Sequence, residues 1–365
     1  MADFARAAVM LEPGQDLAMI DYPLPHVKEG CILVRVDCCT ICGSDLHSWA
    51  GRRPAPTPII LGHEIVGRIA ELGPGAPVDS HGRLLKVGDR ITWTLVDSCG
   101  HCYYCSDKEL PMKCLSLRKY GHDSCADAPH FKGGFAEYCY LTPGTAIVRV
   151  PDELTNEEVS PANCALATAV AAWQSARLCS LENVLVQGVG ALGLYAVALA
   201  KHAGCRRIIA SDVDSSRLAL AVSFGATDTI DASRLSEANL ISHVHELSGG
   251  FGVDCVLEAA GNPQLIPLGL RCLRKGGRLV EVGSVVPGAH FTYDASELIS
   301  RRLTLMGIHN YDNRHLQAAV DFLAATRQRF PFAKIVTHRV SLERIAEGLQ
   351  VAHCGEAIRV AILPG

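Results

Sequence analysis

Short apolar segments separated by Gly- and Pro-containing turns characterise the first 150 residues. Apolar runs at 32–36, 59–61 and 90–95 alternate with turn sequences such as GPGAP and KVGDR. Runs of this length, bounded by turn residues, predict β-strands. The region from Ala7 to about Val150 is therefore predicted to be a β-rich, barrel-like domain.

The pattern changes after Pro151, where helical and strand-like segments begin to alternate. An Ala-rich helical stretch over 161–178 leads to a predicted strand at 184–187 and a predicted helix at 192–203. Further strands, with amphipathic segments between them, are predicted at 207–210, 253–258, 278–282 and 303–306, and the tail adds a helix at 317–327 and a strand at 357–363. This alternation predicts an α/β fold with a parallel, doubly wound Rossmann sheet.

Composition narrows the class of protein. A chain of 365 residues fits two domains. The formal charge of −4 and the lack of long basic runs argue against nucleic acid as a partner, and no apolar run is long enough to span a membrane. The N-terminus lacks a signal-peptide pattern, so we expect a soluble, cytoplasmic protein. A disulfide framework is then not expected from its 16 cysteines, and metal binding is the better explanation for those that cluster.

A glycine-rich fingerprint, GVGALG, follows the predicted strand at 184–187 and opens the next helix. Gly188 permits the tight turn, Gly190 lets the backbone approach a pyrophosphate, and Gly193 lets the helix pack closely on the strand. Leu192 stands between the last two glycines, in the first turn of a helix whose N-terminus faces the phosphate charge. The pattern predicts a dinucleotide site, although an ordinary glycine turn would share part of it.

Asp212, nineteen residues past Gly193, ends the next predicted strand. A carboxylate there accepts hydrogen bonds from the adenosine ribose and repels a 2′-phosphate, which favours NAD over NADP. Asp214 is the alternative acid. Three arginines keep NADP open as the second choice: Arg206, Arg207 and Arg217.

Four cysteines are spaced by two, two and eight residues: Cys99, Cys102, Cys105 and Cys114. Four thiolates close a tetrahedral shell around zinc and leave no open position, as in a structural site. An iron–sulfur cluster, which would make the protein an electron carrier, and a redox CxxC motif are the alternatives. In a ferredoxin the fourth cysteine normally follows sooner and precedes Pro, whereas Leu115 follows here.

A second, sparser set contains Cys42 in CGSDLH and His63 in GHE. One thiolate and one imidazole are half of a catalytic zinc shell, which keeps a position open for substrate. In isolation such a pair is more often a core cysteine and a hydrogen-bonded histidine, and a third ligand is needed.

Together these motifs resemble the zinc-dependent alcohol dehydrogenases of the medium-chain dehydrogenase/reductase superfamily, over essentially the whole chain. CGSDLH, GHE, VGDR, the four cysteines, GVGALG and FGAT occur in the family's order. The resemblance implies a GroES-like catalytic domain over 1–165, an NAD-binding Rossmann domain over 166–308 and a return segment over 309–365 that completes the catalytic domain. It also implies two zinc ions and a homodimer or homotetramer.

The resemblance assigns further residues. Cys164 matches the third catalytic zinc ligand, with Glu157 or Glu158 as the alternative, and Thr168 matches a nicotinamide contact. Glu64 resembles a carboxylate beside the zinc, as a neighbour or a transient ligand, and Asp45 resembles the acid that orients His63. The remaining assignments are Ser44 and His47 to a proton relay, Arg217 to the adenosine ribose, Arg359 to the pyrophosphate and Val282 to the nicotinamide carboxamide.

The implied reaction transfers hydride between an alcohol and NAD, giving an aldehyde or ketone. GRRP, LRKYGH, LTPGTAIV and PANCA resemble alcohol dehydrogenases associated with phosphonate metabolism. The alcohol is then secondary or anionic, with four candidates to pair a phosphonate: Arg52, Arg53, Lys119 and His122. Solvated loop cations are the plainer interpretation of these residues. A polyol dehydrogenase and an NADP-linked aldehyde reductase remain alternatives within the family.

Overall fold

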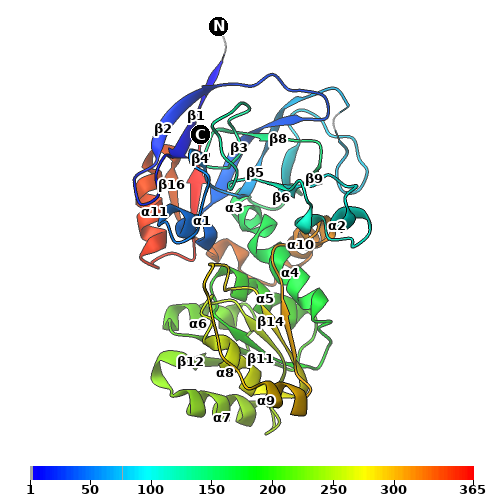
Figure 1. Cartoon of the computed structure of the whole chain (residues 1–365), viewed down its shortest axis with the longest axis vertical. Coiled ribbons are helices and arrows are strands. Elements are labelled where there is room, and N and C mark those ends of the chain that lie inside the picture. Colours follow the sequence, from blue (N-terminus) through cyan, green and yellow to red (C-terminus); the bar gives the residue numbers. More distant parts are fainter. Residues whose placement is uncertain (1–2, 76) are drawn as a thin grey trace. The chain divides into compact units, whose positions relative to one another are not determined.

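The computed structural model describes residues 3–75 and 77–365, which form two compact units (Figure 1). The first unit contains the described residues up to Cys164, together with Asp312–Arg327 and Phe332–Gly365. The second contains Ala165–Tyr311 and Gln328–Pro331. The chain thus leaves the first unit at Cys164 and later returns to complete it.

Mostly antiparallel strands build the first unit. They are β1 (Phe4–Met10), β2 (Ala18–Pro23), β3 (Ile32–Thr40), β4 (Ile59–Ile60), β5 (Glu64–Leu72), β6 (Arg90–Asp97), β7 (Arg118–Lys119), β8 (Tyr138–Leu141), β9 (Thr145–Arg149), β16 (Val336–Ser341) and β17 (Arg359–Leu363). A small sheet has the order β2-β1-β4, and a larger one runs β16-β17-β3-β5-β6-β7, with β8 on β3 and β9 on β6. Aromatic side chains such as Trp93, Phe131 and Phe135 fill the core of this unit.

Short helices decorate these sheets. They are α1 (Gly43–Trp49), α2 (Tyr103–Ser106), α3 (Asn156–Val159), α10 (Asn313–Thr326) and α11 (Ile345–His353), with 3-10 turns at Pro111–Lys113, Ser160–Asn163, Phe332–Lys334 and Leu342–Arg344. Helix α3 begins at a reciprocal cap, in which Thr155 accepts the Glu158 N–H and Glu158 accepts the Thr155 N–H. Helix α10 begins at a similar cap formed by Asp312 and His315.

The second unit is a parallel α/β sheet, as the sequence predicts. Its strands are β10 (Asn183–Gln187), β11 (Arg207–Asp212), β12 (Asp228–Asp231), β13 (Val253–Glu258), β14 (Leu273–Glu281) and β15 (Thr304–Gly307), and its helices are α4 (Ala165–Ser175), α5 (Ala191–His202), α6 (Ser215–Ser223), α7 (Glu237–Leu247), α8 (Leu265–Cys272) and α9 (Ala295–Ser300), with a 3-10 turn at Ala232–Arg234. The strand order β12-β11-β10-β13-β14-β15 reverses direction beside β10, the first strand, as in a doubly wound sheet.

The structure differs from the sequence expectation in several places, among them β16 and α11 of the tail, which were not predicted. Strand β12 was not predicted, because only Ile230 of its four residues is buried and the apolar signal is too short. The predicted helix over 161–178 is interrupted: a 3-10 turn ends at Asn163, and α4 begins at Ala165. Cys164 lies between them with φ −134° and ψ −75°, outside the helical region.

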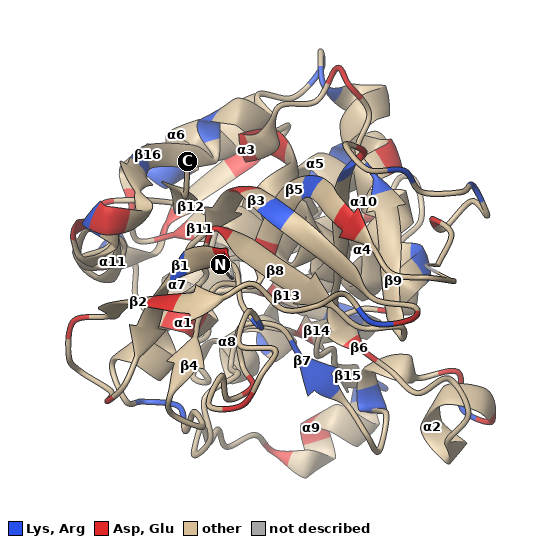
Figure 2. Cartoon of the chain, turned by 90° about the horizontal axis from the view of Figure 1, so that it is seen from above, with Lys and Arg blue, Asp and Glu red and all other residues tan. Residues whose placement is uncertain are grey.

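Charged residues of both signs are interspersed over the elements (Figure 2). Among the described residues, no helix has both the length and the apolar character needed to cross a bilayer.

Candidate metal centres and cofactor site

Four candidate ligands from distant parts of the sequence meet in the first unit. Their ligand atoms all lie within 4.8 Å of one another: Cys42, His63, Glu64 and Cys164. Cys42 caps helix α1, and His63 directly precedes β5. The Sγ atoms of Cys42 and Cys164 are 4.0 Å apart, which is close to the separation of about 3.8 Å for two sulfurs on one tetrahedral zinc. The donor set therefore fits a catalytic zinc.

Asp45 joins the two loops that carry Cys42 and His63. Its Oδ2 accepts the Cys42 N–H at 2.9 Å, and its Oδ1 accepts the Gly62 N–H at 3.1 Å and lies 3.2 Å from His63 Nδ1. Burial alone would lower the pKa of His63, but the buried carboxylate of Asp45 outweighs it and raises that pKa to about 10. Because Asp45 holds the proton on Nδ1, His63 presents Nε2 as its ligand atom.

The Cys42 thiol is the more acidic of the cysteine pair. A hydrogen bond with Cys164 lowers the Cys42 pKa well below its ordinary value, and Arg359, with Nη2 3.8 Å from Cys42 Sγ, lowers it further against the effect of burial. The bond to Cys42 and burial raise the pKa of Cys164 in turn. Cys42 is thus favoured as a thiolate, and a metal that bound both sulfurs would displace the remaining proton of Cys164.

Glu64 is held by Arg359 on the other side of the cluster. Arg359 donates from Nε to Glu64 Oε2 at 3.0 Å and from Nη2 to Oε1 at 3.2 Å, and Thr40 Oγ1 donates to Oε2 at 2.6 Å. Burial raises the Glu64 pKa to about 7, although Arg359 acts in the opposite direction. Both carboxylate oxygens are therefore occupied, which favours a neighbour of the metal over a permanent ligand. The pyrophosphate contact of Arg359 stays a prediction.

The two relay residues lie on helix α1. Ser44 Oγ is 3.3 Å from His63 Nε2, so its hydroxyl lies at the ligand atom of the metal site. His47 Nδ1 is buried and has no hydrogen-bond partner among the described residues. Burial and the charge of Arg52 lower the His47 pKa, which favours a neutral ring able to accept a proton. The relay itself stays a prediction.

The structure also separates the alternative third ligands. Glu157 accepts from Arg339 Nε at 3.0 Å, and Glu158 accepts from Arg327 as well as from its capped helix end. Neither belongs to the group of ligand atoms around Cys42, whereas Cys164 does.

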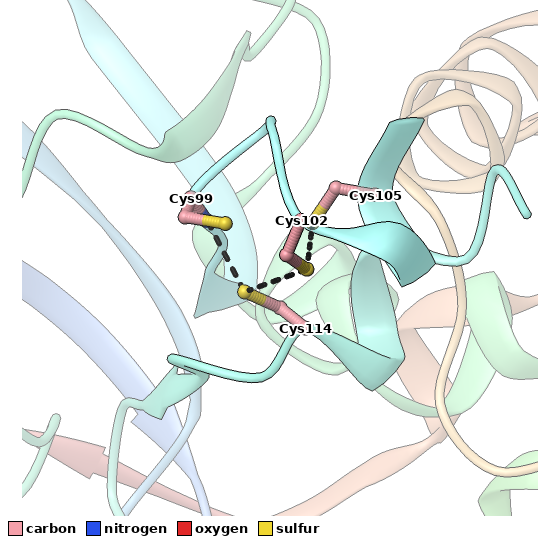
Figure 3. Close-up of side chains that lie close together, drawn as sticks. All are labelled: Cys99, Cys102, Cys105 and Cys114. Atoms are coloured by element: carbon pink, nitrogen blue, oxygen red, sulfur yellow. Dashed lines mark hydrogen bonds between the residues drawn. The ribbon is translucent and has the colours of Figure 1, made fainter. Parts of the chain in front are cut away.

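The four-cysteine lobe is a separate cluster in the first unit (Figure 3). Cys102 Sγ lies 3.5 Å from Cys105 Sγ and 4.0 Å from Cys114 Sγ, and all four ligand atoms lie within 4.8 Å of one another. Backbone N–H groups of Cys99 and Ser116 donate to Cys114 Sγ at 3.3 Å each. A backbone hydrogen bond from Leu115 helps to lower the Cys102 pKa to about 6. Four sulfurs supported in this way fit a closed, structural zinc site.

A cavity of about 570 Å³ in the second unit lies at the carboxyl ends of β10 and β11. Gly188, which lines it, has φ +86°, and a Cβ there would lie 2.7 Å from Ala260, so no other residue fits. A Cβ on Gly193 would lie 1.9 Å from the Gly188 carbonyl oxygen, whereas Gly190 faces open space. Gly188 and Gly193 therefore have no room for a side chain, whereas the approach of a pyrophosphate to Gly190 stays a prediction.

The carboxylate of Asp212 lines the same cavity. Its Oδ2 accepts the Val189 N–H at 2.8 Å, and its Oδ1 accepts the N–H groups of Val213 at 2.8 Å and Asp214 at 3.0 Å. Asp214, the alternative acid, instead caps α6. Arg217 also lines the cavity.

Comparison with known proteins settles the family. The alcohol dehydrogenase GroES-like domain matches residues 28–152, and the zinc-binding dehydrogenase domain matches residues 191–325. The chain is 33% identical over 364 residues to the 5-exo-hydroxycamphor dehydrogenase of Pseudomonas putida, with 98% of each chain covered. The chain belongs to the zinc-dependent alcohol dehydrogenase family.

Solved structures of similar proteins have the same fold as this zinc-dependent dehydrogenase. An alcohol dehydrogenase from Thermotoga maritima matches with a TM-score of 0.94 and 30% identity, over 99% of this chain and 100% of that one. A zinc-binding dehydrogenase from Sinorhizobium meliloti, bound to NADP, matches with a TM-score of 0.87 and 25% identity, over 99% and 100%. The GroES-like and Rossmann folds are thus confirmed. The matches establish the family without extending to the phosphonate-associated subgroup.

The remaining assigned residues lie in the second unit of the dehydrogenase. Thr168 is a largely buried residue of α4, and Leu192 lies in the first turn of α5. Val282 follows β14, and its N–H donates to the Glu258 carbonyl oxygen at 3.1 Å. Their contacts with a nicotinamide cofactor stay predictions.

The group of Cys42, His63, Glu64 and Cys164 is called the catalytic cluster from here on. The sequence did not predict its direct neighbours. It did not connect Arg359 with Glu64, which are 295 positions apart, and it did not place His122 beside His63, with ring centroids 4.8 Å apart. Thr40 was not singled out either. No spacing pattern could have found these contacts, because they depend on how the strands pair.

Proposed function

We propose that the protein is an NAD-linked zinc alcohol dehydrogenase that transfers hydride between an alcohol and NAD, giving an aldehyde or ketone. The observation that carries the proposal is the catalytic cluster: the sulfurs of Cys42 and Cys164, 4.0 Å apart, lie with the His63 ring, and the Ser44 hydroxyl is 3.3 Å from His63 Nε2. A hydroxyl at that place is positioned to bond the oxygen of an alcohol that approaches the metal site.

Bound zinc supplies a positive charge that lowers the pKa of an alcohol oxygen. The side chains of the chain then have separate tasks. Asp45 fixes the tautomer and orientation of His63. Ser44 would take up the alcohol proton while it gives up its own, and neutral His47, whose buried Nδ1 has no partner among the described residues, would receive the released proton. Arg359 holds Glu64 beside the cluster and balances the negative charge of Cys42.

The cofactor preference rests on Asp212. Its carboxylate lies in the cavity beside the fingerprint glycines, where it would repel the 2′-phosphate of NADP. Support for a nicotinamide cofactor in general comes from the Sinorhizobium meliloti relative, which is bound to NADP. We propose NAD for this chain because an acid, rather than an arginine, ends β11.

A panel of primary, secondary and polyhydric alcohols, and the corresponding aldehydes, assayed with NAD and NADP by nicotinamide absorbance, tests the proposal. We expect alcohol oxidation with NAD, and a weaker rate with NADP. Asp212→Ala should raise KM for NAD by about tenfold and relax the preference. A zinc-loaded protein that is inactive on the whole panel contradicts the proposed reaction, and an unchanged preference in Asp212→Ala contradicts the part played by Asp212.

A further inference from the structure

Two basic residues, Arg53 and Lys119, adjoin His122, whose ring packs against the ring of His63. Arg53 follows helix α1, and Lys119 lies in β7, the short strand with a blue arrow in Figure 2. Both side chains are half-buried. Within residues 3–75 and 77–365, no carboxylate forms an ion pair with either of them, whereas the adjacent Arg118 pairs with Asp97.

A hydrogen-bond chain fixes Arg53 next to the metal ligand His63. Arg53 Nη1 donates to His122 Nε2 at 3.2 Å, because a guanidinium has only donors. His122 must therefore carry its proton on Nδ1, which lies 3.0 Å from the Tyr120 carbonyl oxygen. The ring of His122 then packs against His63, with centroids 4.8 Å apart.

This arrangement shows which of the four basic residues proposed from the sequence could bind an anion. His122 is neutral and both of its ring nitrogens are occupied, so it serves as a support for Arg53 and not as an anion ligand. Arg52 is exposed, whereas Arg53 is half-buried. Arg53 and Lys119 are the two that remain.

Lys119 shares its surroundings with Arg53 and His122. Burial lowers its pKa to about 8, and the positive charge of Arg53 acts in the same direction. The His122 N–H donates to the Lys119 carbonyl oxygen at 3.0 Å, so Lys119 belongs to the same turn as the histidine that holds Arg53. Side chains alternate across a strand, so Lys119 and the ion-paired Arg118 point to opposite sides of β7.

We infer that Arg53 and Lys119 form an oxyanion subsite beside the catalytic cluster, and that the substrate is a small alcohol carrying a carboxylate, phosphate or phosphonate group. The inference rests on the proposed function, because it takes the alcohol oxygen to lie at the metal site. Asp123 Oδ2 accepts the Lys119 backbone N–H at 2.9 Å but forms no ion pair with the Lys119 ammonium, so a substrate anion would give both half-buried cations the direct partner that they lack among the described residues. The Arg53 fork suits a planar pair of oxygens, and Lys119 adds a point charge.

Matched substrates test the subsite in the zinc-loaded protein. We would measure kcat/KM for 3-hydroxybutyrate, 2-hydroxypropylphosphonate and neutral 2-butanol in the unmodified protein and in Arg53→Met and Lys119→Met. Each variant should lower kcat/KM for the anionic alcohols by roughly ten- to a hundredfold, the range for a charge-assisted hydrogen bond, with a much smaller change for 2-butanol. The two anionic arms distinguish a carboxylate from a phosphonate substrate.

Arg344→Met is the matched control, since Arg344 is exposed and its guanidinium pairs with Glu347 and not with a residue of the subsite. The control should leave the kcat/KM for each anionic alcohol, relative to that for 2-butanol, unchanged. Zinc content and melting temperature show whether each variant is folded, and Lys119→Gln replaces Lys119→Met if the latter fails to fold.

Calorimetric binding of methylphosphonate and propionate gives a readout that does not depend on turnover. Oxidation of 2-butanol without any preference for anionic alcohols, and equal anion binding in both variants, overturns the subsite while the proposed function stands. Methylphosphonate binding that is lost in Lys119→Met, in a protein inactive on every alcohol, upholds the subsite and overturns the proposed function.

Discussion

The two cysteine clusters use the same ligand atom in different surroundings. In the four-cysteine lobe, backbone N–H groups of Cys99 and Ser116 support the sulfur of Cys114. Around Cys42 and Cys164 the support comes from charged side chains that belong to distant parts of the chain, such as Arg359. A lobe built from one short segment suits a site that only has to hold its metal.

The catalytic cluster offers a mixed set of ligands that can leave one coordination position of a metal open. It has two sulfurs, one imidazole and a carboxylate that Arg359 already occupies. The Ser44 hydroxyl lies at its edge, 3.3 Å from His63 Nε2. A mixed set of this kind leaves a position for substrate, whereas four sulfurs do not. The proposed difference in function therefore follows both from the ligand set and from the groups around the sulfurs.

Cys42→Ala should have the largest effect on activity. Removing this thiolate takes away one ligand of the catalytic metal, so zinc should fall from about two to about one per chain and activity by about a thousandfold or more, corresponding to several kcal/mol of lost charge stabilisation. Metal analysis and an assay with NAD check both. NAD binding should stay near normal, since the fingerprint glycines lie in the other unit. Surviving activity means that Cys42 is not a ligand.

Asp45→Asn should have the next largest effect. The Asp45 carboxylate accepts from two backbone N–H groups and from His63, and an amide must present a donor to one of them. We expect zinc to bind about 10- to 100-fold more weakly at the catalytic cluster. Competition with a chelator measures this, and the lobe zinc serves as the internal control because Asp45 does not contact it. Equal loss of both metals would show global unfolding instead.

Cys102→Ser should affect stability more than chemistry. Loss of the lobe zinc removes metal-binding energy from the folded state; an expected loss of about 3 kcal/mol would lower Tm by several degrees. Activity at low temperature should fall by less than about tenfold, because the lobe shares no ligand with the catalytic cluster. A scan of thermal unfolding beside the assay separates the two effects. An activity loss as large as that of Cys42→Ala would contradict the proposal that the lobe supports stability and the catalytic cluster supports the reaction.

The sequence was informative where a site lies within one short segment. The spacing of Cys99 to Cys114 and the glycines from 188 to 193 could be interpreted directly, and the predicted strand at 253–258 has the bounds of β13. Cys42 and His63 could be assigned as metal ligands only from the order of all the motifs along the chain. The contact of Arg359 with Glu64 depends on the pairing of β17 with β3 and of β3 with β5, which no local pattern contains. The break at Cys164 was missed because its Ala-rich flanks are typical of a continuous helix.

Cys354→Ser should have the smallest effect, and it tests whether a cysteine outside both clusters contributes to metal binding. Cys354 is exposed at the end of α11, and among the described residues its thiol accepts one hydrogen bond, from Gln350 Nε2 at 3.4 Å. Stability should change by no more than about 0.5 kcal/mol, as for most surface substitutions, and both zinc ions should remain. Thermal unfolding and metal analysis check this. A lost zinc would mean that exposed cysteines also bind metal, so that surroundings alone do not distinguish ligands from other thiols. Retention of both would show that metal binding follows the arrangement of the sulfurs in space and not the number of cysteines.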